Sequence, residues 1–284
     1  MEYKNPQLPE GINTSTEHPF REFLTLLVGV IVLVLVAGLV LAMAADRLAK
    51  YIPFEFEARF VEPMLADGKG ADAAGAHVEI NRYLNTLAAE LSEHMEVPEG
   101  IHFTVHYGDT DDVNASAWIG GQIRLERGLL RRLKHENALS MVLAHEMAHV
   151  VERHPIRSLG RGLVIMAFLS TLTGVGTDWV GSNVVSSAGI LPNLKFSRDQ
   201  ETEADRIALA AVDSYYGHIN GAADLFRLFK DAEGGVLRTP LTVFRTHPMT
   251  DERLQMIENY HSEGAPAPVT PFPTGMARWL RQAR

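Results

Sequence analysis

Two histidines and a glutamate lie within an otherwise apolar stretch of this 284-residue chain, at residues 138–151. His145 and His149 are four residues apart, which places them on one face of a helix. Burying imidazoles among apolar side chains is costly unless each one has a partner. The H-E-x-x-H spacing therefore predicts a buried helix that binds a zinc ion. A core helix with hydrogen-bonded histidines is the alternative.

A hydrolytic zinc ion needs a third protein ligand, because it takes three and leaves the fourth position to water. The chain has no cysteine, so histidine and carboxylate ligands remain. We expect Glu201 to be this ligand, on a helix over residues 198–212. Asp205 lies on the same helix face as Glu201, which otherwise carries small apolar residues. Its carboxylate can accept a hydrogen bond from the second N–H of a zinc-binding imidazole and so hold that ring in place. The alternative is a solvated helix start in which Glu201 pairs with Arg198, but the two histidines favour the ligand role.

Two further groups have the chemistry to take part in hydrolysis. Glu146 lies about 100° around the helix from His145, so it is placed to take a proton from zinc-bound water rather than to share the metal. His247, which precedes Pro248, can donate a hydrogen bond to the oxyanion that forms during hydrolysis. A structural or exposed loop histidine is the alternative for His247.

The net charge limits the partners that the chain can bind. Asp and Glu total 35 against 26 Lys and Arg, which gives a formal charge of −9. No basic stripe is visible that could neutralise phosphates. We therefore expect no nucleic-acid partner.

Residues 24–45 carry no charge and reach about 33 Å as a helix, enough to cross a bilayer core of about 30 Å. We expect one transmembrane anchor in contact with membrane lipid. A cleaved signal peptide is the alternative, since residues 42–44 resemble a cleavage site, but the long apolar run favours an uncleaved anchor. The side of the span that follows it has one more Lys or Arg than the side that precedes it, which slightly favours a cytoplasmic C-terminal side. A difference of one residue does not decide the orientation.

The remaining patterns predict a mainly α-helical protein with a small β-sheet. Residues 78–91 repeat apolar residues at helical spacing, residues 101–107 alternate like a strand, and residues 114–125 predict two strands joined by a tight turn. We expect five segments along the chain: an N-terminal tail 1–23, the anchor 24–45, a juxtamembrane connector 46–75, a globular domain 76–262 and a Pro-rich C-terminal tail 263–284.

A second apolar stretch, residues 162–176, follows the two histidines. If His145 and His149 share a metal with a later ligand, the chain between them crosses the membrane zero or two times. Residues 179–192 are too short and polar for a second crossing. We therefore expect a core helix or an apolar flap near the membrane surface.

Four motifs together resemble the M48 family of membrane-associated zinc metallopeptidases, which includes HtpX-, Ste24-, OMA1- and BepA-like proteases. Residues 145–149 match the family's H-E-x-x-H, and residues 197–205 match its S-R-x-x-E-x-x-A-D context. Residues 114–121 are similar to the family's N-A-F-A-x-P-G-G edge strand, with Ser116 in place of the aromatic residue and Ile119 in place of proline. Residues 246–253 match T-H-P-x-x-x-x-R. Four motifs in this order are far more specific than one.

The resemblance implies a gluzincin-type metallopeptidase domain, mainly α with a small sheet, behind one transmembrane helix. It implies one zinc ion per chain, held by three ligands: His145, His149 and Glu201. Asp205 would support a ligand, Glu146 would be the general base, and His247 would stabilise the tetrahedral intermediate. An extended polypeptide substrate would pair with the edge strand, which consists of Asn114, Ala115, Ser116, Ala117 and Trp118.

We therefore expect a membrane-anchored zinc endopeptidase that cleaves polypeptides in envelope protein quality control. Similarity to single-anchor bacterial proteases predicts an inner-membrane location with the domain facing the periplasm, although the marginal charge count points the other way. A membrane-tethered chaperone or adaptor that binds extended chains, with a structural or vestigial zinc site, is the alternative. The sequence leaves the oligomeric state open.

Overall fold

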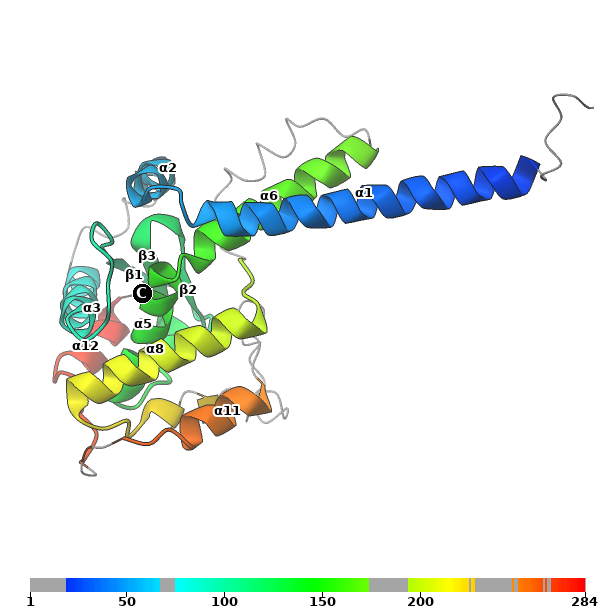
Figure 1. Cartoon of the computed structure of the whole chain (residues 1–284). Helices are drawn as coiled ribbons and strands as arrows, with labels where there is room; N and C mark the ends of the chain where they lie inside the picture. The colour runs from blue at the N-terminus through cyan, green and yellow to red at the C-terminus, as the bar shows by residue number, and fades with distance from the viewer. Residues whose placement is uncertain are drawn as a thin grey trace, which may run out of the picture.

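The computed structural model describes residues 19–66, 75–173, 194–224, 226–227, 247, 250–262, 264 and 267–283. Most of them form a helical domain, and two long helices project from it (Figure 1). The projecting helices are α1 (Pro19–Ala49) and α6 (His154–Thr173). The domain contains α2 (Phe54–Ala66), α3 (Ala76–Ser92), α4 (Arg127–Leu130), α5 (Glu136–Val151), α8 (Arg198–Tyr216), α11 (Asp251–Glu258) and α12 (Met276–Gln282). The expected fold class, mainly α with a small sheet, is confirmed.

A three-stranded sheet lies on one side of the domain, with the strand order β1-β3-β2. β1 (Thr104–Gly108) pairs with β3 (Gln122–Glu126) in parallel, and β2 (Ala115–Ala117) pairs with β3 in antiparallel fashion. Among the described residues β2 is therefore an edge strand, as expected, and it packs against α5. Its outer edge keeps backbone groups that a further strand could pair with.

The tight turn between β2 and β3 depends on two consecutive glycines. Gly120 has a φ of 69° and Gly121 a φ of 73°, a region in which L-residues with a side chain are strained. A Cβ at Gly121 would also overlap the carbonyl oxygen of His102. The turn forms a short 3₁₀ helix, η1 (Ile119–Gly121), and α2 packs directly on it.

The helix with the two histidines, α5, runs through the centre of the domain and packs along α8 (Figure 1). Leu139, Met141 and Leu143 on α5 are completely buried, which explains why the segment is apolar on all sides. The start of α8 is fixed by a capping box, in which Ser197 and Gln200 bond each other's backbone N–H groups. Gly217 ends α8 in the left-handed conformation.

The C-terminal segment, expected as a Pro-rich tail, returns to the domain core. Met276 and Leu280 of α12 are buried in the main apolar cluster, and α12 packs against α3. The carbonyl of Leu280 accepts a hydrogen bond from Arg131. Residues 276–284 are compatible with a short basic helix that lies on another part of the protein, and the structure shows such a helix at Met276–Gln282. Its periodic signal is too short to identify α3 as the partner.

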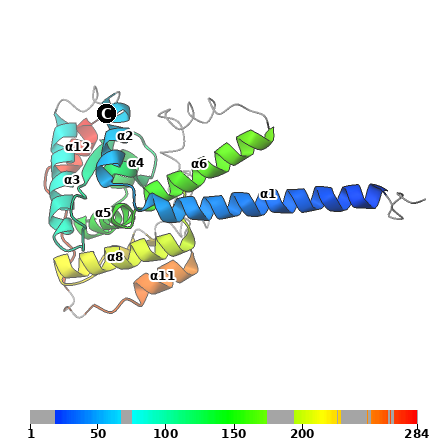
Figure 2. The ribbon, with the colours of Figure 1, turned by 45° about the horizontal axis from the view of Figure 1, so that its top comes forward.

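Helices α1 and α6 lie side by side where they leave the domain and diverge toward the outer end of α6 (Figures 1 and 2). Their inner ends belong to a small buried cluster of the domain, to which Ala49 and Ile156 contribute. In the described part of the chain, α1 is the one helix long and apolar enough to cross a membrane by length and composition. It begins at Pro19 and ends at Ala49, so it extends beyond the span of residues 24–45 at both ends. Residues 162–173 form the second half of α6, which contacts α1, and Leu163 also packs against a small buried cluster that includes Ile119 and Phe196. Residues 174–176 lie outside the described residues.

Candidate metal centre

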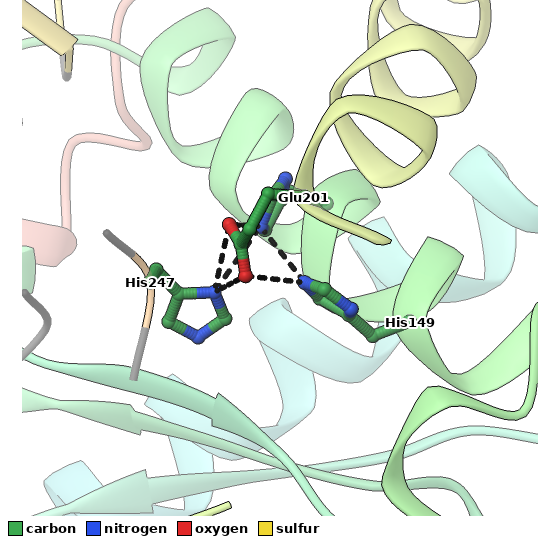
Figure 3. A group of neighbouring side chains, drawn as sticks. His149, Glu201 and His247 are labelled. Carbon is green, nitrogen blue, oxygen red and sulfur yellow. Dashed lines mark hydrogen bonds and ion pairs between the residues drawn. The ribbon is translucent and has the colours of Figure 1, made fainter. Parts of the chain in front are cut away.

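Four side chains from separate parts of the chain converge at one buried point. His145 and His149 come from α5, Glu201 from the first turn of α8, and His247 from a segment of which only this residue is described. Each offers one ligand atom, and these atoms all lie within 4.8 Å of one another. Figure 3 shows the rings of His149 and His247 facing the carboxylate of Glu201.

The distances between these atoms suit a tetrahedral zinc ion. The Nε2 atoms of His145 and His149 are 3.0 Å apart, and they lie 3.5 Å and 3.6 Å from the carboxylate oxygens of Glu201. Ligand atoms bound tetrahedrally at about 2.0–2.1 Å from a zinc ion are roughly 3.3 Å from each other. The three side chains therefore fit one zinc ion without rearrangement.

The second nitrogen of each imidazole faces away from the centre, toward another polar group. Nδ1 of His145 lies 2.9 Å from Oδ1 of Asp205, a carboxylate that can only accept a hydrogen bond. When the ring of His145 is neutral, a proton on Nδ1 faces this carboxylate and the lone pair of Nε2 is directed at the centre. Nδ1 of His149 lies 2.9 Å from Nδ1 of His154, the first residue of α6.

Charge favours a cation at the centre. Burial raises the pKa of Glu201 and of Asp205, but the surrounding histidines and Arg253 outweigh burial and hold both pKa values below their usual range. Burial lowers the pKa of His149 well below 6.5 and keeps this ring neutral, as a ligand must be. Burial also lowers the pKa of His145, but contacts with Asp205 and Glu201 raise it to about 10. In the metal-free protein the protonated ring of His145 thus balances part of the negative charge of Glu201 and Asp205, which a bound divalent ion would otherwise balance.

Glu146 lies beside the ligand atoms without joining them. It is only 2% exposed, and its Oε2 atom has no hydrogen-bond partner. Its Oε1 atom is 3.6 Å from Nε2 of His247. A buried carboxylate with an unused oxygen next to a metal site is the arrangement that a general base for a bound water requires.

His247 lies closer to the centre than a hydrogen-bond donor for an oxyanion needs to be. Its Nδ1 atom is 3.1 Å from Oε1 of Glu201 and 3.4 Å from Nε2 of His145. It is thus within reach of the fourth position around a metal ion. Sequence reasoning placed this imidazole near the reaction but did not indicate this close approach.

Arg253 belongs to the site, and sequence reasoning gave it no role. Its Nε and Nη2 atoms donate to the two oxygens of Asp205 at 2.6 Å and 2.8 Å, and its Nη1 atom is 2.8 Å from Glu201. The side chain is 4% exposed. One guanidinium therefore orients both carboxylates of α8. The signal was present, because Arg253 closes the T-H-P-x-x-x-x-R segment.

His154 and Phe196 were also missed. Phe196 stacks on the ring of His149 with ring centroids 4.0 Å apart, and so limits how that ring can turn. Nε2 of His154 is 3.3 Å from Glu203, which links His149 to α8 through a second histidine. The sequence offered no periodic signal for these contacts, because the chain turns sharply at Arg153, where φ is 61°.

The strand expected to bind substrate, β2, packs against α5, the helix that carries His145 and His149. Ala115 and Ala117 face inward and are buried, whereas Ser116 is half-buried. The indole of Trp118 donates a hydrogen bond to the hydroxyl of Ser116 at 3.1 Å. Asn114 precedes β2, and its Oδ1 atom is buried without a hydrogen-bond partner. The Ser116–Trp118 pair gives this edge a side-chain surface that the resemblance alone does not predict.

Comparison with known proteins points to the same chemistry. Residues 79–261 match the profile of peptidase family M48. A beta-barrel assembly-enhancing protease of Yersinia pestis is 29% identical over 205 residues, which cover 66% of this chain and 40% of that protein. The mitochondrial metalloendopeptidase OMA1 of Schizosaccharomyces pombe is 34% identical over 154 residues, 53% of this chain and 44% of that protein.

A third relative, the metalloprotease YcaL of Escherichia coli K12, is 30% identical over 158 residues, which cover 55% of this chain and 61% of that protein. The aligned region spans less than two thirds of the length of each of these relatives. The similarity therefore concerns the domain that carries the metal centre.

Proposed function

The chain belongs to peptidase family M48, whose profile matches more than half of it, and from this premise we propose that it is a membrane-anchored zinc endopeptidase. The observation that carries the proposal is the convergence of His145, His149 and Glu201 at zinc-ligand distances, with Glu146 beside them. One zinc ion per chain, held by these three residues, would polarise the scissile carbonyl and lower the pKa of a bound water to about 7.

The protein groups then have distinct tasks. Glu146 accepts the proton of the attacking water through its unpaired oxygen and passes it to the leaving amine. Asp205 holds the ring of His145 through Nδ1, and Arg253 holds Asp205 and Glu201 in place. His247 donates a hydrogen bond to the developing oxyanion, which requires its ring to move away from Glu201 when a substrate binds.

The substrate that we propose is a polypeptide in extended conformation. It would add a strand to the outer edge of β2, so that main-chain hydrogen bonds hold it beside the metal centre. Residues 114–118 would form this contact, with Ser116 and Trp118 as the side chains that meet the substrate. Backbone recognition of this kind tolerates many sequences, as a quality-control protease requires.

The location follows from α1, which we propose as a single transmembrane anchor. Its uncharged part is long enough to cross a bilayer, and its apolar side chains are mostly exposed. We propose that the domain faces the periplasm of a bacterial inner membrane and acts on misfolded or membrane-associated proteins of the envelope. A reporter fused after residue 284 tests this orientation.

The experiment that tests the proposed activity is the substitution Glu146→Gln, with Glu152→Gln at the end of α5 as the matched control. The Glu146→Gln protein should bind one zinc ion per chain and cleave casein about 10²–10⁴-fold more slowly, because only the general base is lost. The control should bind zinc and cleave at the parent rate. Cleavage by Glu146→Gln at the parent rate would exclude the general-base role, and unchanged cellular function would favour the chaperone or adaptor alternative.

A further inference from the structure

We propose that the second half of α6, residues 162–173, lies within the lipid bilayer beside α1, so that the protein enters the membrane with two helices rather than one. The proposal rests on the membrane anchor of the proposed function. The two helices run in opposite directions; they lie side by side near the domain and diverge toward the outer end of α6 (Figures 1 and 2).

The first observation is that both helices lose their charges at the same level. Residues 23–45 of α1 carry no charge, and Asp46 is the first charged residue after them. In α6 the last charged residue is Arg161, and residues 162–173 carry none. Asp46 pairs with Arg157 and with Arg161, each at 3.0 Å. These ion pairs therefore mark one common boundary between a charged and an uncharged zone, as expected at a membrane surface.

The second observation is close packing beyond that boundary. Gly160 lies against Ala49, and further along α6 the ring of Phe168 covers Gly38, in the middle of the uncharged part of α1. The buried residues of α1 are Gly38, Ala42 and Ala49. Small residues in a seam are the means by which helices approach each other in lipid, where no hydrophobic effect drives them together.

The third observation is the apolar surface that this pair leaves uncovered. Ile165 on α6 is 45% exposed, and Leu41 on α1, which lies near the same level by the contacts above, is 56% exposed. Both residues lie beyond the ion pairs of Asp46, in the uncharged parts of their helices. A solvent that suits α1 at this level must therefore also surround α6, and that solvent is lipid.

The length of the uncharged segment sets how deep α6 reaches. Twelve residues span about 18 Å as a helix, more than half of a hydrocarbon core of about 30 Å and too little to cross it. Within a helix the backbone groups bond to one another, as lipid requires, whereas the last four carbonyls of α6 need other partners at this depth. At the other end, His154 contacts His149, so about 12 Å of helix separates the metal centre from residue 162. The site is thus held close to the membrane surface.

The test uses single cysteines, since the chain has none of its own. Cysteine is introduced at Ile165, at Leu41 as the control of matched depth, or at the exposed Glu99 as the control in water, and labelled with the fluorophore NBD. The full chain is reconstituted in phosphatidylcholine vesicles. Quenching is measured with nitroxides on the acyl chains and with aqueous iodide. Circular dichroism must match the parent for each variant.

The proposal predicts that acyl nitroxides quench NBD at position 165 within about twofold of position 41 and several-fold more than at position 99, with the opposite order for iodide. If position 41 is quenched by the nitroxides but position 165 by iodide, α6 lies in water and the proposal is wrong while the anchor stands. If position 165 is shielded from both quenchers, protein rather than lipid covers α6, which also overturns the proposal. Iodide quenching at position 41 would refute the anchor itself.

Discussion

Removing the charge of Asp205 should weaken zinc binding without removing a ligand. In Asp205→Asn the side chain keeps its shape, but the carboxylate that lies 2.9 Å from Nδ1 of His145 becomes a neutral amide. The amide accepts a weaker hydrogen bond, or presents its NH₂ group to the ring and opposes the required tautomer. Both effects reduce the basicity of the Nε2 atom of His145 that binds the metal.

The expected size follows from the contacts. Loss of a carboxylate behind a ligating histidine typically weakens metal binding by about 10–100-fold, or roughly 1.4–2.7 kcal/mol. The same change removes one of the carboxylates that Arg253, which is 4% exposed, contacts, while its contact with Glu201 at 2.8 Å stays. Breaking a buried ion pair costs about 3–5 kcal/mol, and we expect the lower end because the contact with Glu201 persists.

Two measurements separate these effects. Zinc affinity is measured by competition with a fluorescent chelator, and the free energy of unfolding of the metal-free protein by urea titration in detergent. Asp199→Asn, on the exposed side of the first turn of α8, is the matched control and should change neither quantity appreciably. The double variant Asp205→Asn, Arg253→Met removes the guanidinium together with the carboxylate, so part of the stability should return because Arg253 is no longer buried without Asp205. Zinc affinity should stay low, because Glu201 has also lost its contact with Arg253.

Zinc binding by Asp205→Asn within twofold of the parent would show that the contact with His145 has no influence on the metal. A double variant that regains zinc affinity together with stability would also contradict the expected role of Asp205. In that case the loss of binding would come from general destabilisation of α8 rather than from the histidine that Asp205 holds.

Two other substitutions test the turn beside the substrate strand. Gly121→Ala should lower the free energy of unfolding by about 1–3 kcal/mol because of backbone strain alone. The loss should be larger because the added Cβ would overlap the carbonyl of His102. An unchanged melting temperature would contradict this expectation. Burial raises the pKa of Glu57 more than its hydrogen bond from Gly120 and its ion pair with Arg153 lower it. When folding raises the pKa of an acid, the free energy of unfolding falls as the pH rises from 4.5 through the raised pKa. Glu57→Gln should therefore abolish the part of the decrease of melting temperature with pH that Glu57 causes.

Helix periodicity explains why much of the site was predictable. A spacing of four residues puts His145 and His149 on one face wherever the helix lies, and the same rule puts Glu201 and Asp205 on one face of α8. The alternation in residues 114–125 and the two glycines between the strands likewise follow local rules, and the structure shows the strands and the turn there.

Local sequence patterns do not predict contacts between groups that meet only after the chain has folded. Arg253 reaches Asp205 from α11, Phe196 stacks on His149 from the segment before α8, and α12 returns to pack on α3. Each contact joins residues that are far apart in the chain, and neither residue spacing nor composition predicts which of these residues lie close together in space.

The sequence by itself determined which chemistry is available: two imidazoles and three carboxylates on buried helix faces, no thiol, and one span long enough for a membrane. Only the tertiary structure decided that Glu201 meets the imidazoles at ligand distances, that His247 lies among them, and that α6 follows α1 away from the domain. The physical reason is that the helical repeat sets directions within one element, whereas distances between elements result from the packing of the whole core.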